Sequence, residues 1–420
     1  MLDTIFAEAT PPGRGGVSVI RLSGALARKT LESLAGPTAE PRKSYLRPLR
    51  DGDDLIDHAL VIWFEKGHSF TGEEVAELHL HGAPVIANRL SAALVSRGLR
   101  RAEAGEFTRR AFLNGRMDLA EAEGLADLLS AETESQRKLA MRATDGELGR
   151  RTELLRAKLV RAGALIEASI DFADEDVPDE VPDEVFSLAA EVRSEIDGML
   201  ASYPATERLR QGYQVAIIGP PNAGKSSLLN RIAQREIALV SDIAGTTRDI
   251  IELATDLRGL PVTFLDTAGL RDSDDPVELM GVARAKERAH DADMRIYLSD
   301  SDESVDVLDD DDIVIRSKAD LHDRKGIAVS AKTGEGVAEL LDMVYDRLRI
   351  RAADSGIVGH KRQAEALARA RDALVVHGRM PPEILAESLR QAAQSLAMMI
   401  GRVGAEEFLD EIFASFCIGK

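Results

Sequence analysis

The stretch that most constrains this chain runs from Val215 to Ser227 and reads VAIIGPPNAGKSS. Val215–Ile218 is short, apolar and rich in β-branched residues, so it predicts a buried strand. The pattern G-x-x-x-x-G-K-S follows, and the apolar Leu228 and Leu229 are typical of a helix start. Because glycines let backbone N–H groups face inward and a helix N-terminus attracts anions, this segment predicts a phosphate-binding loop.

Two side chains of this loop have an expected chemical role, and a third has two readings. Lys225 should reach the outer phosphates of a nucleotide and act in catalysis, and Ser226 should hold Mg²⁺. Asn222 could bind a monovalent cation that supplies positive charge where no arginine is evident, or it could only stabilise the turn. The loop residues expected to bind nucleotide are Asn222, Ala223, Gly224, Lys225, Ser226 and Ser227.

Two further motifs of a nucleotide site follow in chain order. The segment 245–249 reads GTTRD, and its threonines could sense Mg²⁺ and a terminal phosphate. A strand predicted over Val262–Leu265 leads into DTAG, where Asp266 suits a Mg²⁺-linked carboxylate. The residues expected to bind nucleotide here are Ser241, Asp242, Thr246, Thr247, Asp266, Thr267, Ala268 and Gly269, with Thr247 also expected to ligate Mg²⁺.

The segment SKAD, after a strand predicted over Ile313–Ile315, indicates the base. Asp320 can accept two hydrogen bonds from guanine N1–H and the exocyclic amine, a pair that adenine cannot offer. Ser317 stands where asparagine usually precedes the lysine, and it is too short to bridge the neighbouring loops, so we expect weakened affinity with the guanine preference retained. The residues expected to bind the base are Lys318, Asp320, Ser330, Ala331 and Lys332.

The segment after DTAG departs from signalling GTPases. Leu270 stands where those proteins place a glutamine that orients water, and leucine cannot do so. Glu278, eight residues further on, is the candidate for positioning the attacking water.

Composition narrows the remaining classes. A net charge of −19 disfavours non-specific nucleic-acid binding by the whole surface. Residues 86–117, however, contain seven arginines and only two glutamates. The basic patch around Arg109 and Arg110 could contact nucleic acid or a partner, or it could be an ordinary solvated helix face. A single cysteine, Cys417, excludes a disulfide framework. We expect neither a signal peptide nor a membrane span, and therefore a cytoplasmic protein.

Periodicity predicts a multidomain α/β protein. Residues 1–117 read as an α+β domain, 118–210 plus 355–420 as an all-α helical domain, and 211–354 as a doubly wound α/β domain inserted into it. In the first domain Glu77 and Arg21 lie on predicted strands, where they could bind a small ligand with amide donors and an acid, or form only a surface ion pair. The pair His79 and His81 is not expected to bind metal, because no third ligand is evident.

Several segments carry a resemblance to a known family. They are ATPPGRGGVSVIRLSG (9–24), SFTGEEVAELHLHG (69–82), GEFTRRAFLNGRMDLAEAE (105–123), the nucleotide-site motifs and the terminal FCIGK (416–420). Over its whole length the chain resembles the MnmE (TrmE) family of tRNA-modifying GTPases.

The resemblance implies a potassium-dependent GTPase that works with an FAD-dependent partner. The pair would form a heterotetramer around a homodimer and add an aminomethyl or carboxymethylaminomethyl group to carbon five of the wobble uridine of certain tRNAs. The implied cofactors are GTP, Mg²⁺, K⁺ and a 5-formyl- or 5,10-methylene-tetrahydrofolate bound by the N-terminal domain.

The resemblance also assigns roles to individual residues. It implies Arg21, Glu77 and Arg116 as folate ligands, the last a lysine in much of the family. It implies Asn222 and Thr246 for K⁺ and Glu278 for catalysis, while Cys417 matches a family cysteine of open role. Two alternatives remain: a GTP-gated ribosome-assembly factor, for which no RNA-binding module is evident, and a folate-binding scaffold whose GTPase site is crippled at Ser317.

Overall fold

The computed structural model describes residues 3–38, 40–171, 181–235, 252–266, 287–288, 290–299, 311–321 and 327–403, together with 409, 413–414, 416 and 419. The chain forms two compact units. The first comprises 1–126, 149–154 and 396–420, and the second comprises 127–148 and 155–395. None of the helices in the described ranges has an apolar run long enough for a bilayer.

A six-stranded sheet organises the first unit, in the order β3-β4-β5-β2-β1-β6. Strands β1 and β6 pair in parallel and all other neighbours are antiparallel. The elements are β1 (Ile5–Glu8), β2 (Val17–Ser23), α1 (Ala27–Ala35), β3 (Tyr45–Asp51), β4 (Asp54–Phe64), β5 (Val75–His81), α2 (Pro84–Ser96), β6 (Arg100–Arg101) and α3 (Glu106–Leu113). The strands predicted around residues 16–22, 58–64 and 75–81 are confirmed.

Alternation along β2 and β5 gives the two faces of this sheet different partners: one face packs against α1 and α2, and the other carries Arg21 and a smaller apolar cluster that includes Phe107 of α3. Ile20 and Leu22 face the core beside α1 and α2, whereas Arg21 between them faces the other side. Leu78 likewise faces the core and its neighbour Glu77 does not. The period of two therefore places Arg21 and Glu77 on the same face, where both side chains are partly buried.

The proposed contact of Arg110 with nucleic acid or a partner is wrong, because Arg110 is an internal residue. Its side chain is 3% exposed, and its Nη2 atom lies 3.0 Å from Asp3 Oδ1 and 2.8 Å from Glu106 Oε1. Its Nη1 atom lies 3.1 Å from Glu73 Oε2. Three carboxylates compensate the buried guanidinium, and a count of charges over residues 86–117 contains only one of them, Glu106, because Asp3 is 107 residues away and Glu73 is 37 residues away.

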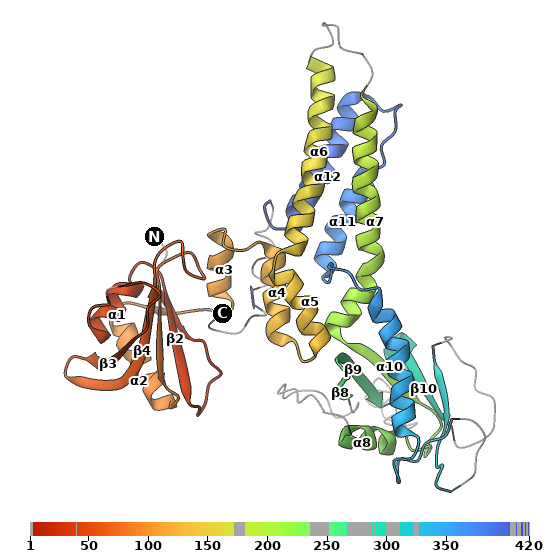
Figure 1. Cartoon of the computed structure of the whole chain (residues 1–420), viewed down its shortest axis with the longest axis horizontal. Helices are drawn as coiled ribbons and strands as arrows, with labels where there is room; N and C mark the ends of the chain where they lie inside the picture. The colour runs from red at the N-terminus through yellow and green to blue at the C-terminus, as the bar shows by residue number, and fades with distance from the viewer. Residues whose placement is uncertain are drawn as a thin grey trace, which may run out of the picture. The chain divides into compact units, whose positions relative to one another are not determined.

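The helices after residue 117 are longer and more continuous than predicted. In the second unit Lys158 of α6 pairs with Glu191 of α7 at 2.9 Å, and α11 packs against α7. Figure 1 shows α6, α7 and α11 as long neighbouring rods. The helices are α4 (Leu119–Ser130), α5 (Glu134–Thr144), α6 (Glu147–Asp171), α7 (Asp183–Gln211), α10 (Val337–Ala353), α11 (Lys361–Ala373) and α12 (Pro382–Met399).

A five-stranded sheet follows α7 directly, in the order β11-β10-β7-β9-β8. All neighbours are parallel except the edge strand β8. Its elements are β7 (Tyr213–Ile218), α8 (Lys225–Arg235), β8 (Glu252–Leu257), β9 (Leu260–Asp266), β10 (Met294–Ser299) and β11 (Ile313–Arg316). The expectation of a doubly wound α/β sheet within a multidomain α/β chain is confirmed.

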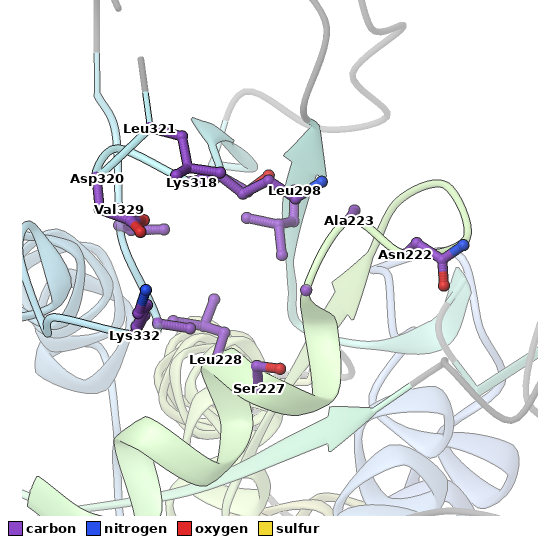
Figure 2. A pocket seen from close by; sticks show the side chains of 13 residues that line it. Asn222, Ala223, Ser227, Leu228, Leu298, Lys318, Asp320, Leu321, Val329 and Lys332 are labelled. Carbon is purple, nitrogen blue, oxygen red and sulfur yellow. The ribbon is translucent and has the colours of Figure 1, made fainter. Parts of the chain in front are cut away.

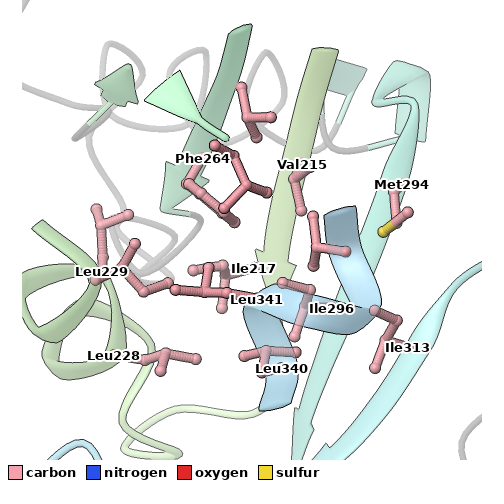
Figure 3. Packing of buried hydrophobic residues seen from close by; sticks show 14 of the residues in the cluster. Val215, Ile217, Leu228, Leu229, Phe264, Met294, Ile296, Ile313, Leu340 and Leu341 are labelled. Atoms are coloured by element: carbon pink, nitrogen blue, oxygen red, sulfur yellow. The ribbon is translucent and has the colours of Figure 1, made fainter. Parts of the chain in front are cut away.

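The core of this sheet explains why its strands are almost continuously apolar. Val215 and Ile296 from neighbouring strands, Leu229 from α8 and Leu340 from α10 meet in one cluster (Figure 3). Because the chain leaves β7 toward β9 on one side and later returns to β10 on the other, the order of the strands reverses beside β7. Ligands of such sheets bind outside the carboxyl ends of the strands at this point.

Asp118, at the start of α4, makes the stability of the first unit depend on pH. Burial, its largest cause, raises its pKa to about 6, although its Oδ1 accepts the Glu121 amide N–H at 2.8 Å. Because the pKa of Asp118 is higher in the folded than in the unfolded chain, the protonated carboxyl stabilises the fold. This contribution is complete below the pKa of the unfolded chain, 3.8, and is lost as the pH rises through the folded pKa of about 6. At neutral pH the ionised carboxylate is therefore unfavourable.

Asp118→Asn should stabilise the first unit at pH 7.5 by about 1–2 kcal/mol, because it keeps the hydrogen-bond acceptor and removes the charge. The gain should shrink as the pH falls toward 4. Urea unfolding followed by the fluorescence of Trp63, the single tryptophan and a buried residue of this unit, measures it. The exposed Asp53→Asn serves as the control, and a gain independent of pH would contradict the assignment.

Candidate functional site

A pocket of about 340 Å³ lies at the carboxyl ends of the parallel strands in the second unit. Figure 2 shows Lys318 and Asp320 on one side of it and Ser227 and Leu228 of the α8 region on another. The lining residues are Asn222, Ala223, Gly224, Ser227, Leu228, Leu298, Ser317, Lys318, Asp320, Leu321, Val329, Ala331 and Lys332. Residues predicted from separate motifs thus share one pocket.

The phosphate-binding loop has the backbone that its glycines predict. Gly219 has a φ of 150°, and a Cβ atom there would overlap the carbonyl oxygen of Leu298, so only glycine fits. Gly224 also has a positive φ of 101°. Asn222 has a φ of 60°, which asparagine tolerates better than most residues. This conformation is consistent with the turn-stabilising role that the sequence left open for Asn222.

Lys225 is the first residue of α8 and is 7% exposed. Its ammonium group donates hydrogen bonds to the carbonyl oxygens of Gly219 at 2.8 Å and Pro220 at 3.0 Å. Burial lowers the pKa of Lys225, and the charge of Asp266 partly offsets that effect. A desolvated ammonium group at a helix N-terminus is suited to bind phosphate oxygens.

Asp266 and Ser226 offer oxygen atoms suited to Mg²⁺. Asp266 ends β9, pairs with Ile217 of β7 in the ladder and is 4% exposed. Ser226 follows Lys225 at the start of α8. A carboxylate and a hydroxyl at the ends of adjacent elements match the oxygen ligands that Mg²⁺ prefers, so the residues present fit this ion.

The base side of the pocket is built around Asp320. Ser330 Oγ donates a hydrogen bond to Asp320 Oδ1 at 2.7 Å and accepts one from the amide of Thr333 at 3.1 Å. The hydrogen bond from Ser330 lowers the pKa of Asp320, so this carboxyl stays ionised and can only accept hydrogen bonds. That property suits the two donors on one edge of guanine.

Ser317 also lines the pocket, but its side chain makes no bridge to another described residue. Its amide donates to the carbonyl oxygen of Ser299 at 2.9 Å, whereas its buried Oγ has no hydrogen-bond partner among the described residues. This finding agrees with the expectation that serine is too short to connect the loops here.

Sequence reasoning missed the apolar walls of the pocket. They are formed by Leu228, Leu298, Leu321 and Val329. Each looks like an ordinary core or loop residue in the sequence, and only the fold brings them to one cavity. The one available signal was position, because Leu321 directly follows Asp320 and Leu298 comes near the end of a buried strand.

Many of the predicted ligands lie outside the described residues. They are Ser241, Asp242, Thr246, Thr247, Thr267, Ala268, Gly269, Glu278 and Cys417. Their roles stay predictions.

The candidate folate residues lie in the first unit. Arg21 Nη2 lies 3.0 Å from Glu77 Oε1, so the structure brings this pair together on the sheet face opposite α1 and α2. The Arg21 guanidinium also lies 5.6 Å from the ring centroid of Phe70 and 5.9 Å from that of Phe107. Arg116 is exposed, and its side chain approaches the loop at Gly72. The aromatic rings are an addition to the predicted set.

The fold and the site define a protein class. The strand order, the glycine-rich loop and the carboxylate of Asp320 in the same pocket are those of a phosphate-loop protein that binds guanine nucleotides. Family models for the GTP-binding protein TrmE N-terminus and the MnmE helical domain match residues 4–116 and 119–417. The tRNA modification GTPase MnmE of Paracoccus denitrificans is 77% identical over the whole of both chains, and that of Roseobacter denitrificans is 48% identical over the same extent.

The chain therefore belongs to the MnmE family of tRNA modification GTPases, and the resemblance seen in the sequence is confirmed. Among solved structures, the G domain of the T. maritima FeoB iron transporter is similar with a TM-score of 0.24 and 23% identity, covering 32% of this chain and 98% of that one.

Proposed function

We propose that this chain hydrolyses GTP and that this hydrolysis serves the modification of tRNA. The observation that carries the proposal is the single pocket in which the phosphate-binding loop, with Lys225 beside it, meets the guanine-reading Asp320. Membership of the MnmE family supports the link to tRNA.

Within this proposal each site residue has a part in hydrolysis. Lys225 neutralises the outer phosphates, and Ser226, Thr247 and Asp266 hold Mg²⁺, which supplies further positive charge to the phosphates. Asn222 and Thr246 bind K⁺. Glu278 positions the attacking water.

The finer chemistry also belongs to the proposal. The chain acts in the cytoplasm as a homodimer, with an FAD-dependent partner in a heterotetramer. Together they place an aminomethyl or carboxymethylaminomethyl group on carbon five of the wobble uridine. Residues 1–117 form the domain that binds the folate, through Arg21, Glu77 and Arg116. The helical domain comprises residues 118–210 and 355–420, and the GTPase domain comprises residues 211–354.

Hydrolysis should be at least about tenfold faster in potassium than in sodium at equal ionic strength. The reason is that a bound K⁺ places positive charge where negative charge develops on the phosphates in the transition state. Phosphate release by the purified chain measures this ratio. Asn222→Gly keeps the positive φ without strain and removes the side chain with its carboxamide oxygen, so it should abolish the difference between potassium and sodium. Unchanged potassium stimulation would assign Asn222 to the turn instead.

The unbridged Ser317 favours one alternative, a folate-binding scaffold with a crippled GTPase site. Titration with a fluorescent GDP distinguishes this scaffold from the proposed enzyme. Micromolar or tighter binding with turnover supports the enzyme, and no binding at millimolar concentration supports the scaffold.

A further inference from the structure

The loop that closes the base pocket is fastened to the helix of the phosphate-binding loop by one side chain. Arg231 Nε donates a hydrogen bond to the carbonyl oxygen of Ala331 at 2.8 Å, and its Nη2 donates to that of Lys332. Arg231 lies three residues after Leu228 in α8, and Leu228, Ala331 and Lys332 all line the pocket. The helix spacing thus directs the guanidinium along the rim of the nucleotide site.

The fastened loop also sets the position of the base reader. Ser330, the residue before Ala331, orients the Asp320 carboxylate through the 2.7 Å hydrogen bond. The rest of the loop closes on itself, since Gly334 N donates to the carbonyl oxygen of Ser330 at 2.8 Å. A displacement of residues 330–332 would therefore move the carboxylate that recognises guanine.

The residue that should join these loops cannot do so here. An asparagine at position 317 would extend a carboxamide with a donor and an acceptor, whereas Ser317 ends in a buried Oγ without a partner in the described part of the chain. The phosphate and base halves of the pocket still need a rigid connection, because selectivity depends on holding Asp320 fixed relative to the phosphates.

We propose that Arg231 is the positioning residue that replaces this bridge and thereby sets guanine affinity and selectivity. The inference rests on the proposed guanine-nucleotide site and adds a specificity-determining residue to it. A guanidinium fork suits the task, because its planar donors can hold two carbonyl groups at once with charge-assisted hydrogen bonds.

The test compares the binding of fluorescent GDP and IDP to the full chain. IDP lacks the exocyclic amine and so loses one of the two hydrogen bonds to Asp320. Arg231→Ala should weaken GDP binding about tenfold, as expected for two lost charge-assisted bonds, and IDP binding less, so that the GDP/IDP affinity ratio shrinks. Arg231→Lys, which keeps one donor group, should lose less than the alanine variant.

A second substitution makes the test independent of general destabilisation. Ser317→Asn in the Arg231→Ala background should restore most of the lost GDP affinity and the GDP/IDP ratio, because it supplies the bridge from the other side. Arg235→Ala, which removes an exposed charge at the end of the same helix, is the matched control and should change neither value.

Two results would overturn the inference while leaving the proposed function intact: an unchanged GDP affinity in Arg231→Ala, or an equal loss for GDP and IDP that Ser317→Asn does not repair. A different result, a wild-type chain that binds neither nucleotide, would overturn the proposed function and this inference with it.

Discussion

Replacing Asp320 by asparagine should transfer the base preference of the pocket from guanine to xanthine. The carboxylate accepts hydrogen bonds from two neighbouring donors of guanine, N1–H and the exocyclic amine. The carboxamide has one acceptor and one donor, which match N1–H and the C2 carbonyl oxygen of xanthine. GTP affinity should fall by about 10³-fold or more, because a site built to pair with a polar group rejects a ligand that leaves its groups unpaired.

Competition binding of GTP and XTP to the wild-type chain and Asp320→Asn measures this exchange. Asp320→Ala is the control, since it should lose GTP without gaining XTP. Ser330→Ala should have a smaller effect in the same direction as the alanine control, because it only releases the carboxylate that Ser330 orients. If Asp320→Asn still preferred GTP to XTP, the base would be read elsewhere in the pocket.

The parts of the site that the sequence predicted are those with local causes. The strand, the loop and the helix around Val215–Ser227 follow from β-branched residues, glycines and helix formers at adjacent positions. The position of Asp320 in the pocket was predictable because one carboxylate can supply both of the acceptors that the proposed guanine contact needs. Arg21 and Glu77 were predictable because a period of two places side chains on one face of a sheet.

The parts that escaped prediction depend on contacts between distant segments. Arg110 looks like a member of a basic patch, and only the fold supplies the carboxylates of Asp3 and Glu73. Arg231 looks like a surface residue of a helix, yet its guanidinium holds a loop 100 residues later. In both cases the arginine bonds to groups that are far away in the sequence, and no local sequence pattern predicts such a contact.

Substituting Lys225 by alanine should reduce GTP hydrolysis by about 10³-fold and weaken nucleotide binding strongly. The buried ammonium group lies against the phosphate-binding loop, and its removal leaves the Gly219 and Pro220 carbonyls without this donor. It also removes the charge that acts on Asp266, so the substitution changes a buried pair rather than a solvated one.

Single-turnover hydrolysis and GDP titration of Lys225→Ala measure both effects, and Arg235→Ala provides the charge-matched control from the exposed end of the same helix. Lys225→Arg should not rescue turnover, because a planar guanidinium cannot replace a compact ammonium group enclosed by two carbonyls of the loop. Full activity in the arginine variant would mean that net charge alone is sufficient, and that the close fit of Lys225 against Gly219 and Pro220 has no part in catalysis.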